Sequence, residues 1–277
     1  QNGRTWECPN FFPLGDQWVL ILSAHIGGKT GLVFYFVGRY EDHQFVPEVE
    51  GTLDHAYLYA PLTTQDDQGR RLLWGWLREG RPVPAQVEAG WSGVQSVPRM
   101  LTLLPDHHLG MEPVSELAAQ RGSHHHYADI DLSTLAEHFT LEPGGRALDI
   151  EAEFTPGQQG TFGLNVLCAA DDSEYTSILY DAQTQQLRIE REHSSLDERV
   201  DHQAHSAAHV LAPDEPLQLR ILVDGSVIEV IANQRTSITS RVYPTRADSV
   251  AVRLVAHDSD GRLRSLHAWE IRSIWPA

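Results

Sequence analysis

Short runs of β-branched and aromatic residues, separated by turns, fill the first part of the chain. Residues 18–22 and 32–37 are two such runs, and the turn at residues 27–31 between them contains three glycines. Runs of about five or six residues bounded by glycine are typical of β-strands. No helical period is present between residues 11 and 46. The hydrophobic pattern therefore predicts strands here.

A second unit of similar layout starts near Ala56. Its segment 57–61 ends in Pro61, 52 positions after Pro9, and a polar turn at 65–69 and a strand at 70–76 follow it. Four-stranded units that repeat at a period of about 50 residues are typical of propeller blades. The repeat therefore predicts two blades.

Beyond residue 128 the pattern changes to a long alternation of apolar and polar positions. The apolar positions are Leu148, Ile150, Ala152 and Phe154; Leu187 and Ile189; Leu217, Leu219, Ile221 and Val223; and Val250, Val252 and Leu254. Period-two alternation gives each strand one buried and one wet face, as in an antiparallel sandwich. The Asp224-Gly225 dipeptide predicts a tight hairpin. We expect Asp224 and Glu229 to be hairpin and surface acids.

The predicted organisation is all-β. Residues 1–120 form the blades, residues 121–127 a polar connector, and residues 128–277 a β-sandwich. The connector contains three adjacent histidines, 124–126. Neighbouring side chains on an extended backbone point to opposite faces, so at most two of these imidazoles could share an ion. We expect neither a metal site nor a cofactor.

Charge narrows the class of partner. The 277 residues include 21 Lys plus Arg and 38 Asp plus Glu, which gives a formal net charge of -17. This field would repel nucleic acid, whereas a neutral sugar would feel little of it. No apolar run approaches the ~20 residues that span a bilayer. We therefore expect neither a nucleic-acid partner nor a membrane partner.

The cysteines and the first residues bear on the cell compartment. Cys8 and Cys168 are too few for a disulfide framework, and both are expected to be thiols. No signal peptide can be read after Gln1, where the chain begins. A cytoplasmic location is slightly favoured over secretion.

The stretch Trp6-Glu7-Cys8-Pro9 carries the strongest chemical signal. It places a carboxylic acid between an indole and a thiol, and Pro9 restricts the backbone beside them. A carboxyl among weakly polar groups has its charged form disfavoured, so it can donate a proton near neutral pH. Glu7 therefore has the features of a general acid. The structural alternative is a surface glutamate beside a buried tryptophan.

This motif, with Phe12-Pro13-Leu14 after it, resembles the acid/base motif of glycoside hydrolase family 32, the invertases, fructan hydrolases and related β-fructofuranosidases. Other stretches match that family in the same order: residues 53–61, 70–76, 91–103 and, for its C-terminal sandwich, 223–230 with 240–244. The resemblance covers essentially the whole chain.

The resemblance implies a five-bladed propeller with a funnel-shaped active site, packed against the sandwich. Of the three catalytic acids of the family, the acid/base matches Glu7. The strings that carry the nucleophilic Asp and the transition-state-stabilising Asp do not occur in the sequence. The chain therefore resembles the last two blades and the sandwich of a retaining hydrolase of terminal β-fructofuranosides. We expect it to be inactive unless an N-terminal part supplies the first three blades.

The matched motifs also suggest residues of a sugar pocket. Asp54 and Tyr59 could hydrogen-bond sugar hydroxyls, and Trp76 could present a face to a sugar ring. Cys8 is expected to pack beside Glu7 rather than act as a nucleophile, since no basic neighbour is adjacent in sequence. The structural alternatives are a turn-capping Asp, a core Tyr and a core Trp.

Two blades without their neighbours would expose apolar residues such as Leu20, Leu22, Phe34 and Phe36. We expect the missing propeller portion or an oligomeric contact to cover them. The expected ligand is sucrose or a fructose-containing oligosaccharide. The alternative function is a lectin-like carbohydrate-binding protein without catalysis, because sandwiches host many functions.

Overall fold

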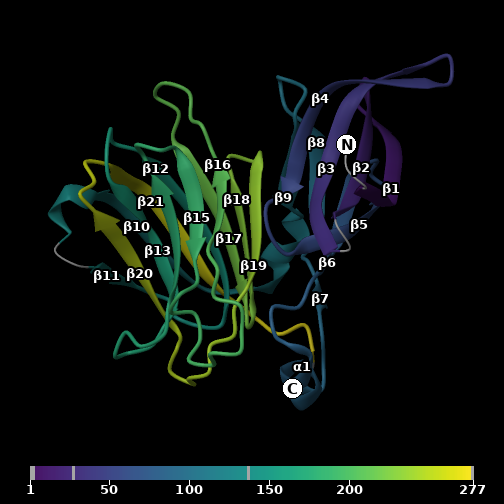
Figure 1. Ribbon diagram of the computed structural model, residues 1–277. Coiled ribbons are helices and arrows are strands. Elements are labelled where there is room, and N and C mark those ends of the chain that lie inside the picture. The colour runs from purple at the N-terminus through teal and green to yellow at the C-terminus, as the bar shows by residue number, and fades with distance from the viewer. Residues whose placement is uncertain (1–3, 27–28, 136–137, 276–277) are drawn as a thin grey trace.

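Two β-rich bodies lie side by side in the protein (Figure 1). The computed structural model describes residues 4–26, 29–135 and 138–275. The first body begins with a four-stranded antiparallel sheet in the order β1-β2-β3-β4. Its strands are β1 Arg4–Leu14, β2 Gln17–Ile26, β3 Lys29–Glu41 and β4 Gln44–Asp54. The strands predicted at 18–22 and 32–37 are confirmed, and Gly27 and Gly28 of the predicted turn lie outside the described residues.

The second sheet of this body repeats the layout of the first. Its strands run in the order β5-β6-β8-β9, and β7 pairs with β6. They are β5 Leu58–Gln65, β6 Arg71–Leu77, β7 Val94–Gln95, β8 Arg99–Leu103 and β9 Leu109–Pro113. A short helix, α1 Val83–Ala89, which the strand pattern did not predict, follows β6. The two sheets share one core, which includes Val19, Ile21, Leu73 and Leu101.

The second body is a sandwich of two six-stranded antiparallel sheets. One sheet contains β10 Arg121–Asp131, β21 Arg262–Ile271, β12 Ala147–Thr155, β17 Leu217–Asp224, β18 Val227–Ala232 and β19 Thr236–Arg241. The other contains β11 His138–Leu141, β20 Ala251–His257, β13 Thr161–Cys168, β14 Thr176–Asp181, β15 Gln186–Glu190 and β16 His205–Ala208. The 3-10 turns η1 Ser115–Gln120 and η2 Leu132–Thr134 flank β10. The predicted all-β fold, with propeller-type sheets followed by a sandwich, is confirmed.

The alternation of apolar and polar residues in the sequence correctly predicted positions of the sandwich core. The inward positions of β12 and β17, such as Ile150 and Ile221, are fully buried. Val250 is an exception, because it precedes β20 and is 36% exposed. The predicted hairpin joins β17 to β18, and its two linking residues are Gly225, at φ 55°, and Ser226, rather than Asp224 and Gly225.

The predicted connector at 121–127 was wrong. These residues lie in β10, which pairs with β21 at the edge of the sandwich. Polar residues occupy it because its outer face is in water, and its histidines stack on β21. His124 and His126 lie 5.2 and 4.3 Å from the ring of His267. A polar stretch can therefore be an edge strand as well as a linker.

The two bodies share backbone and core contacts. Between β4 and β5, the N–H groups of His55 and Tyr57 donate to the carbonyls of Ser237 and Thr239 on β19, at 3.0 and 2.9 Å. The side chain of Ile231, from β18, packs into the core of the first body. The sandwich therefore holds the β4–β5 segment, which leads directly to the candidate site. In the described residues no helix is long and apolar enough to cross a membrane.

Candidate active site

A bulge in β1 presents Glu7. The register with β2 shifts between Glu7 and Asn10, and Cys8 takes a left-handed backbone at φ 51° just before Pro9. A bulge re-aims the side chains beside it, and proline blocks regular continuation of the ladder. The side chain of Glu7 is half-buried rather than directed wholly into solvent.

Asn10 fixes this bulge to the neighbouring sheet. Its side-chain amide donates to the carbonyl of Cys8 at 3.0 Å and to the carbonyl of Pro61 at 2.9 Å. Its side-chain oxygen accepts from the backbone N–H of Thr63 at 2.9 Å. One side chain therefore holds the β1 bulge against β5. Asn10 was not predicted as a site residue, although its place directly after the Pro9 motif was a usable signal.

The repeat of 52 positions has a structural counterpart in β5. Ala60 has φ 46° and precedes Pro61, as Cys8 precedes Pro9, and the register with β6 shifts between Tyr59 and Leu62. The backbone N–H of Ala60 donates to the Ser23 hydroxyl on β2 at 3.0 Å. Two equivalent bulges on adjacent sheets therefore aim Glu7 and Tyr59 at one another.

Tyr59 donates its hydroxyl proton to Oε2 of Glu7 at 2.7 Å. Tyr59 is 3% exposed, and burial together with this hydrogen bond raises its pKa to about 12. The phenol is therefore a fixed donor at any ordinary pH. Among the described residues, Tyr59 is the hydrogen-bond partner of the Glu7 carboxylate. The other carboxylate oxygen can thus serve a ligand.

Trp76 and Arg78 flank the Glu7–Tyr59 pair. The ring of Trp76 meets that of Tyr59 edge-on, with centroids 6.5 Å apart, and Trp76 is 46% exposed. The Arg78 guanidinium lies 5.4 Å from the centre of the Tyr59 ring. Trp76 therefore has a free surface for a ring-shaped ligand. Cys8 is exposed, and its predicted packing beside Glu7 stays a prediction.

The assignment of Asp54 to the sugar pocket was wrong. Asp54 is fully buried at the end of β4, where its carboxylate accepts from the hydroxyls of Ser237 and Thr239 at 2.7 and 2.6 Å. It also accepts from the Ala56 N–H at 3.0 Å, as a turn-capping aspartate does. No ligand can reach it without unfolding the contact between the two bodies.

Glu229 is also buried, contrary to its prediction as a surface acid. It is 3% exposed and accepts from the guanidinium of Arg99 at 2.6 Å and from the N–H of Val97 at 2.8 Å. Arg99 is fully buried and also lies 3.5 Å from the Asp54 carboxylate. We call Asp54, Arg99 and Glu229 the buried triad. It joins the bodies and takes no part in the candidate site.

Two of the three histidines at 124–126 meet a fourth histidine, His267, and Nε2 of His124 lies 3.0 Å from its Nδ1. His124 and His126 stack with His267, and His124 also stacks on Trp269 at 4.7 Å. In the described part of the chain no group of three or more His, Cys, Asp or Glu side chains could hold a metal ion. The two cysteines are free thiols, as predicted, and burial raises the pKa of Cys168 to about 11.

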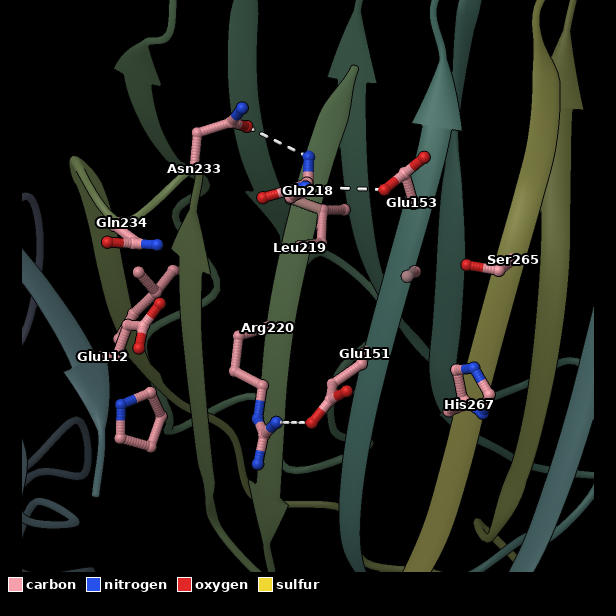
Figure 2. A pocket seen from close by; sticks show the side chains of 13 residues that line it. Glu112, Glu151, Glu153, Gln218, Leu219, Arg220, Asn233, Gln234, Ser265 and His267 are labelled. Carbon is pink, nitrogen blue, oxygen red and sulfur yellow. Dashed lines mark hydrogen bonds and ion pairs between the residues drawn. The ribbon is translucent and has the colours of Figure 1, made fainter. Parts of the chain in front are cut away.

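A separate pocket of about 400 Å³ lies between β9 and the outer face of the sandwich (Figure 2). Glu112 of β9 stands on one side of it, and the ion pair of Glu151 with Arg220 stands on the other. None of the predicted site residues lines this pocket. The candidate active site is therefore the surface around Glu7, Tyr59 and Trp76.

Comparison with known protein families gives two matches that together cover nearly the whole chain. The N-terminal domain of the glycosyl hydrolases family 32 matches residues 1–113, and the C-terminal domain of the same family matches residues 116–270.

Individual relatives carry names that agree with these matches. An insoluble β-fructofuranosidase, isoenzyme CWINV3 of Arabidopsis thaliana, is 29% identical over 97% of this chain and 57% of its own length. A levanase of Bacillus subtilis is 27% identical over 99% of this chain and 44% of its own length. The chain thus spans roughly half the length of these relatives.

Solved structures show the same fold. Fructan 1-exohydrolase IIa from Cichorium intybus superposes with a TM-score of 0.86 at 21% identity, over 97% of this chain and 62% of that one. An exo-inulinase from Aspergillus awamori superposes with a TM-score of 0.81 at 20% identity, over 99% and 58%. The arrangement of blades and sandwich is therefore common to these proteins.

Proposed function

Because this chain belongs to glycoside hydrolase family 32, we propose that it carries the general acid/base of a retaining glycosidase that acts on terminal β-fructofuranosides such as sucrose or fructans. The observation that supports this most directly is the hydrogen bond from Tyr59 to Glu7. It holds a half-buried carboxyl in one orientation beside the exposed ring of Trp76. The names of the relatives, β-fructofuranosidase and levanase among them, support the substrate class.

In the proposed reaction Glu7 acts twice. It first protonates the leaving oxygen while a carboxylate nucleophile attacks the anomeric carbon and forms a covalent glycosyl-enzyme. It then takes a proton from the water that hydrolyses this intermediate. Tyr59 orients the acid, and Trp76 and Cys8 are proposed to contact the sugar. Retention of the anomeric configuration requires the carboxyls of the acid/base and of the nucleophile to lie about 5 to 5.5 Å apart.

The nucleophile is proposed to come from a segment outside these 277 residues. Neither of the two Asp-containing strings of the family occurs in the sequence. Glu7 alone can transfer protons but cannot form the glycosyl-enzyme. We therefore propose that these residues by themselves do not hydrolyse fructosides, and that a propeller portion bearing the nucleophile completes the site.

The outer face of the first sheet supports this proposal. Phe11, Trp18, Tyr40 and Phe45 from all four strands cluster on it, with ring centroids about 5 Å from Phe11 or from one another. Phe11 and Tyr40 are 41% and 37% exposed. Exposed aromatic clusters of this kind mark contact surfaces.

Two further corrections apply to this face. Of the residues predicted to be exposed on it, Leu20, Phe34 and Phe36 are half-buried, and Leu22 is buried at 2% exposure. The aromatic cluster is therefore uncovered, together with Trp6, which is 63% exposed and lies 6.4 Å from the ring of Phe36. We propose that the completing propeller portion covers it, or failing that a second copy of the chain.

The test compares residues 1–277 alone with the same residues joined to the completing segment. We expect sucrose or inulin hydrolysis only from the joined protein, measured by release of free fructose. We also expect the isolated residues to self-associate in light scattering, and a Phe11→Ser variant to reduce that association. Fructose release by the isolated residues would refute the proposed division of the site. No release by either form would refute the fructosidase function and favour a carbohydrate-binding protein.

A further inference from the structure

A pocket of about 520 Å³ lies where the sandwich meets the candidate active site. One wall is formed by Trp76, Arg78 and Glu79, at the end of β6 and just beyond it. The opposite wall includes Asp201 and His205, which belong to the sandwich. The pocket is therefore built from both bodies of the protein.

The pocket adjoins the acid through shared residues. Trp76 and Arg78 line it, and both pack against the ring of Tyr59, at 6.5 and 5.4 Å. Tyr59 in turn holds Glu7 at 2.7 Å. A molecule in the pocket would therefore lie on the Glu7 side of the candidate site.

Under the proposed function, on which this inference rests, Glu7 protonates the leaving oxygen, so the leaving group lies on the same side as Glu7. We propose that this pocket binds the leaving-group sugar, and that Asp201 of the sandwich is a specificity-determining residue that accepts hydrogen bonds from its hydroxyls. The sandwich would then help to choose the substrate as well as stabilise the blades.

Asp201 is held in place on several sides. Its Oδ2 accepts from the Tyr57 hydroxyl at 2.6 Å and from the Arg191 guanidinium at 2.8 Å. Its Oδ1 accepts from the Gln203 N–H at 3.0 Å, and its own N–H donates to the Gly80 carbonyl at 2.9 Å. These contacts fix the carboxylate, yet its side chain is 38% exposed. A rigid and accessible acceptor is what recognition of a sugar hydroxyl requires.

The two acids of the pocket are each paired with an arginine. Burial opposes ionisation of Asp201 and Glu79, but hydrogen bonds outweigh it and lower the pKa of each to about 2. Both carboxylates are therefore ionised at neutral pH, and each is paired with a guanidinium at 2.8 Å, Asp201 with Arg191 and Glu79 with Arg81. The Arg78 guanidinium keeps its positive charge, because its hydrogen bonds go to neutral groups of Thr30, Ala56 and Tyr57. Trp76 offers a hexose a ring face.

The main experiment uses the joined enzyme and two substrates with different leaving groups. Sucrose carries a hexose, and methyl β-D-fructofuranoside carries a methyl group too small to reach the pocket. We expect Asp201→Asn to lower kcat/KM for sucrose about tenfold, since a hydrogen bond to the leaving-group sugar is lost. It should change kcat/KM for the methyl fructoside less than about twofold. The control is Asp67→Asn, an exposed acid of the turn between β5 and β6, which should leave both unchanged.

The outcomes distinguish a role of Asp201 in sugar recognition from a purely structural role. An equal fall in kcat/KM for both substrates would mean that Asp201 acts only through the contact between the two bodies. No fall in kcat/KM for either substrate would mean that Asp201 does not contact the leaving group. Either result would overturn the inference. If the wild-type enzyme cleaves neither substrate, the proposed function fails instead. The pocket is then tested alone by saturation-transfer NMR of the 277-residue chain with glucose. The signal should weaken in Asp201→Asn and not in Asp67→Asn, and equal signals in all three proteins would overturn the inference.

Discussion

Glu7 and Asp54 both lie near the start of a stretch that resembles a family motif, yet their surroundings in the protein differ. Asp54 is fully buried and takes hydrogen bonds from two hydroxyls and a backbone N–H, with Arg99 at 3.5 Å. Glu7 is half-buried and is held by Tyr59 through one oxygen. A carboxylate whose acceptor sites are all filled can only hold structure together. One with an oxygen left for a ligand can transfer a proton.

The buried triad and the candidate site also differ in how far each charge depends on its partners. Burial raises the pKa of Glu229 in the buried triad even though the Arg99 guanidinium opposes it. The triad thus contains two acids and one cation in a region without solvent, an arrangement that tolerates no loss of a partner. In the described residues the Glu7 carboxylate has one hydrogen bond, from Tyr59, and Trp76 and Arg78 flank this pair. Substitutions should therefore affect stability in the first region and catalysis in the second.

The largest effect is expected for Arg99→Met. It removes the cation and leaves the Asp54 and Glu229 carboxyls buried without compensation, which should lower the free energy of unfolding by up to ~5 kcal/mol. Equilibrium urea unfolding measures this. Arg70→Met is the control, since Arg70 pairs with Asp66 and Glu116 near the surface and should cost less than ~1 kcal/mol. Equal effects of the two variants would contradict a structural role for the buried triad.

The second largest effect is expected for Glu7→Gln, which should change catalysis but not stability. The amide cannot protonate the leaving oxygen, so kcat of the joined enzyme on sucrose should fall roughly 10³-fold. Its oxygen can still accept from Tyr59, so the free energy of unfolding should change by less than ~0.5 kcal/mol. Steady-state kinetics and urea unfolding of the same preparation provide both numbers. A large loss of stability would place Glu7 with the structural acids.

The sandwich should lose stability in acid through two histidines. Burial, more than any neighbouring charge, lowers the pKa of His205 and His209 to about 4. In the unfolded chain a histidine titrates near 6.5, so between pH 6.5 and 4 the unfolded state binds more protons, and stability falls as pH falls. Each histidine should lower the free energy of unfolding by roughly 2 kcal/mol when the pH falls from 7 to 5.

Urea midpoints at the two pH values measure this loss. His209→Gln should reduce it by about half, because one of the two histidines remains. The exposed His43→Gln serves as the control and should leave it unchanged. A pH dependence that is identical in wild type and His209→Gln would show that other groups cause it.

The smallest effect is expected for Tyr59→Phe. It removes the hydrogen bond to Glu7 but keeps the ring between Trp76 and Arg78, so kcat/KM should fall about tenfold, which is ~1.4 kcal/mol. Steady-state kinetics of the joined enzyme measure this fall. An unchanged kcat/KM would mean that the Tyr59 hydroxyl does not orient the acid. Trp18→Phe, on the outer face of the first sheet, should leave kcat/KM unchanged.

Much of the fold could be predicted because strand alternation and repeat spacing are local properties. The alternation of Ile150 and Ile221 identified the sandwich core, and the spacing of Pro9 and Pro61 identified the two repeated sheets. The polar segment at 121–127 was misread because an edge strand and a linker have the same composition when one face is in water. Glu229 was misread because its partner Arg99 lies 130 positions away.

The order of residues along the chain determined the all-β architecture, the repeat and the candidate for the proton donor, since backbone preference and side-chain chemistry act over a few neighbouring residues. Only the tertiary structure decided which acids are free to react. It brought Tyr59 to Glu7 from 52 positions away, closed the buried triad around Asp54, and placed Asp201 in the same pocket as Trp76. The reason is physical: the solvation and partners of a carboxyl are set by what folding packs around it, and strands distant in sequence supply those groups.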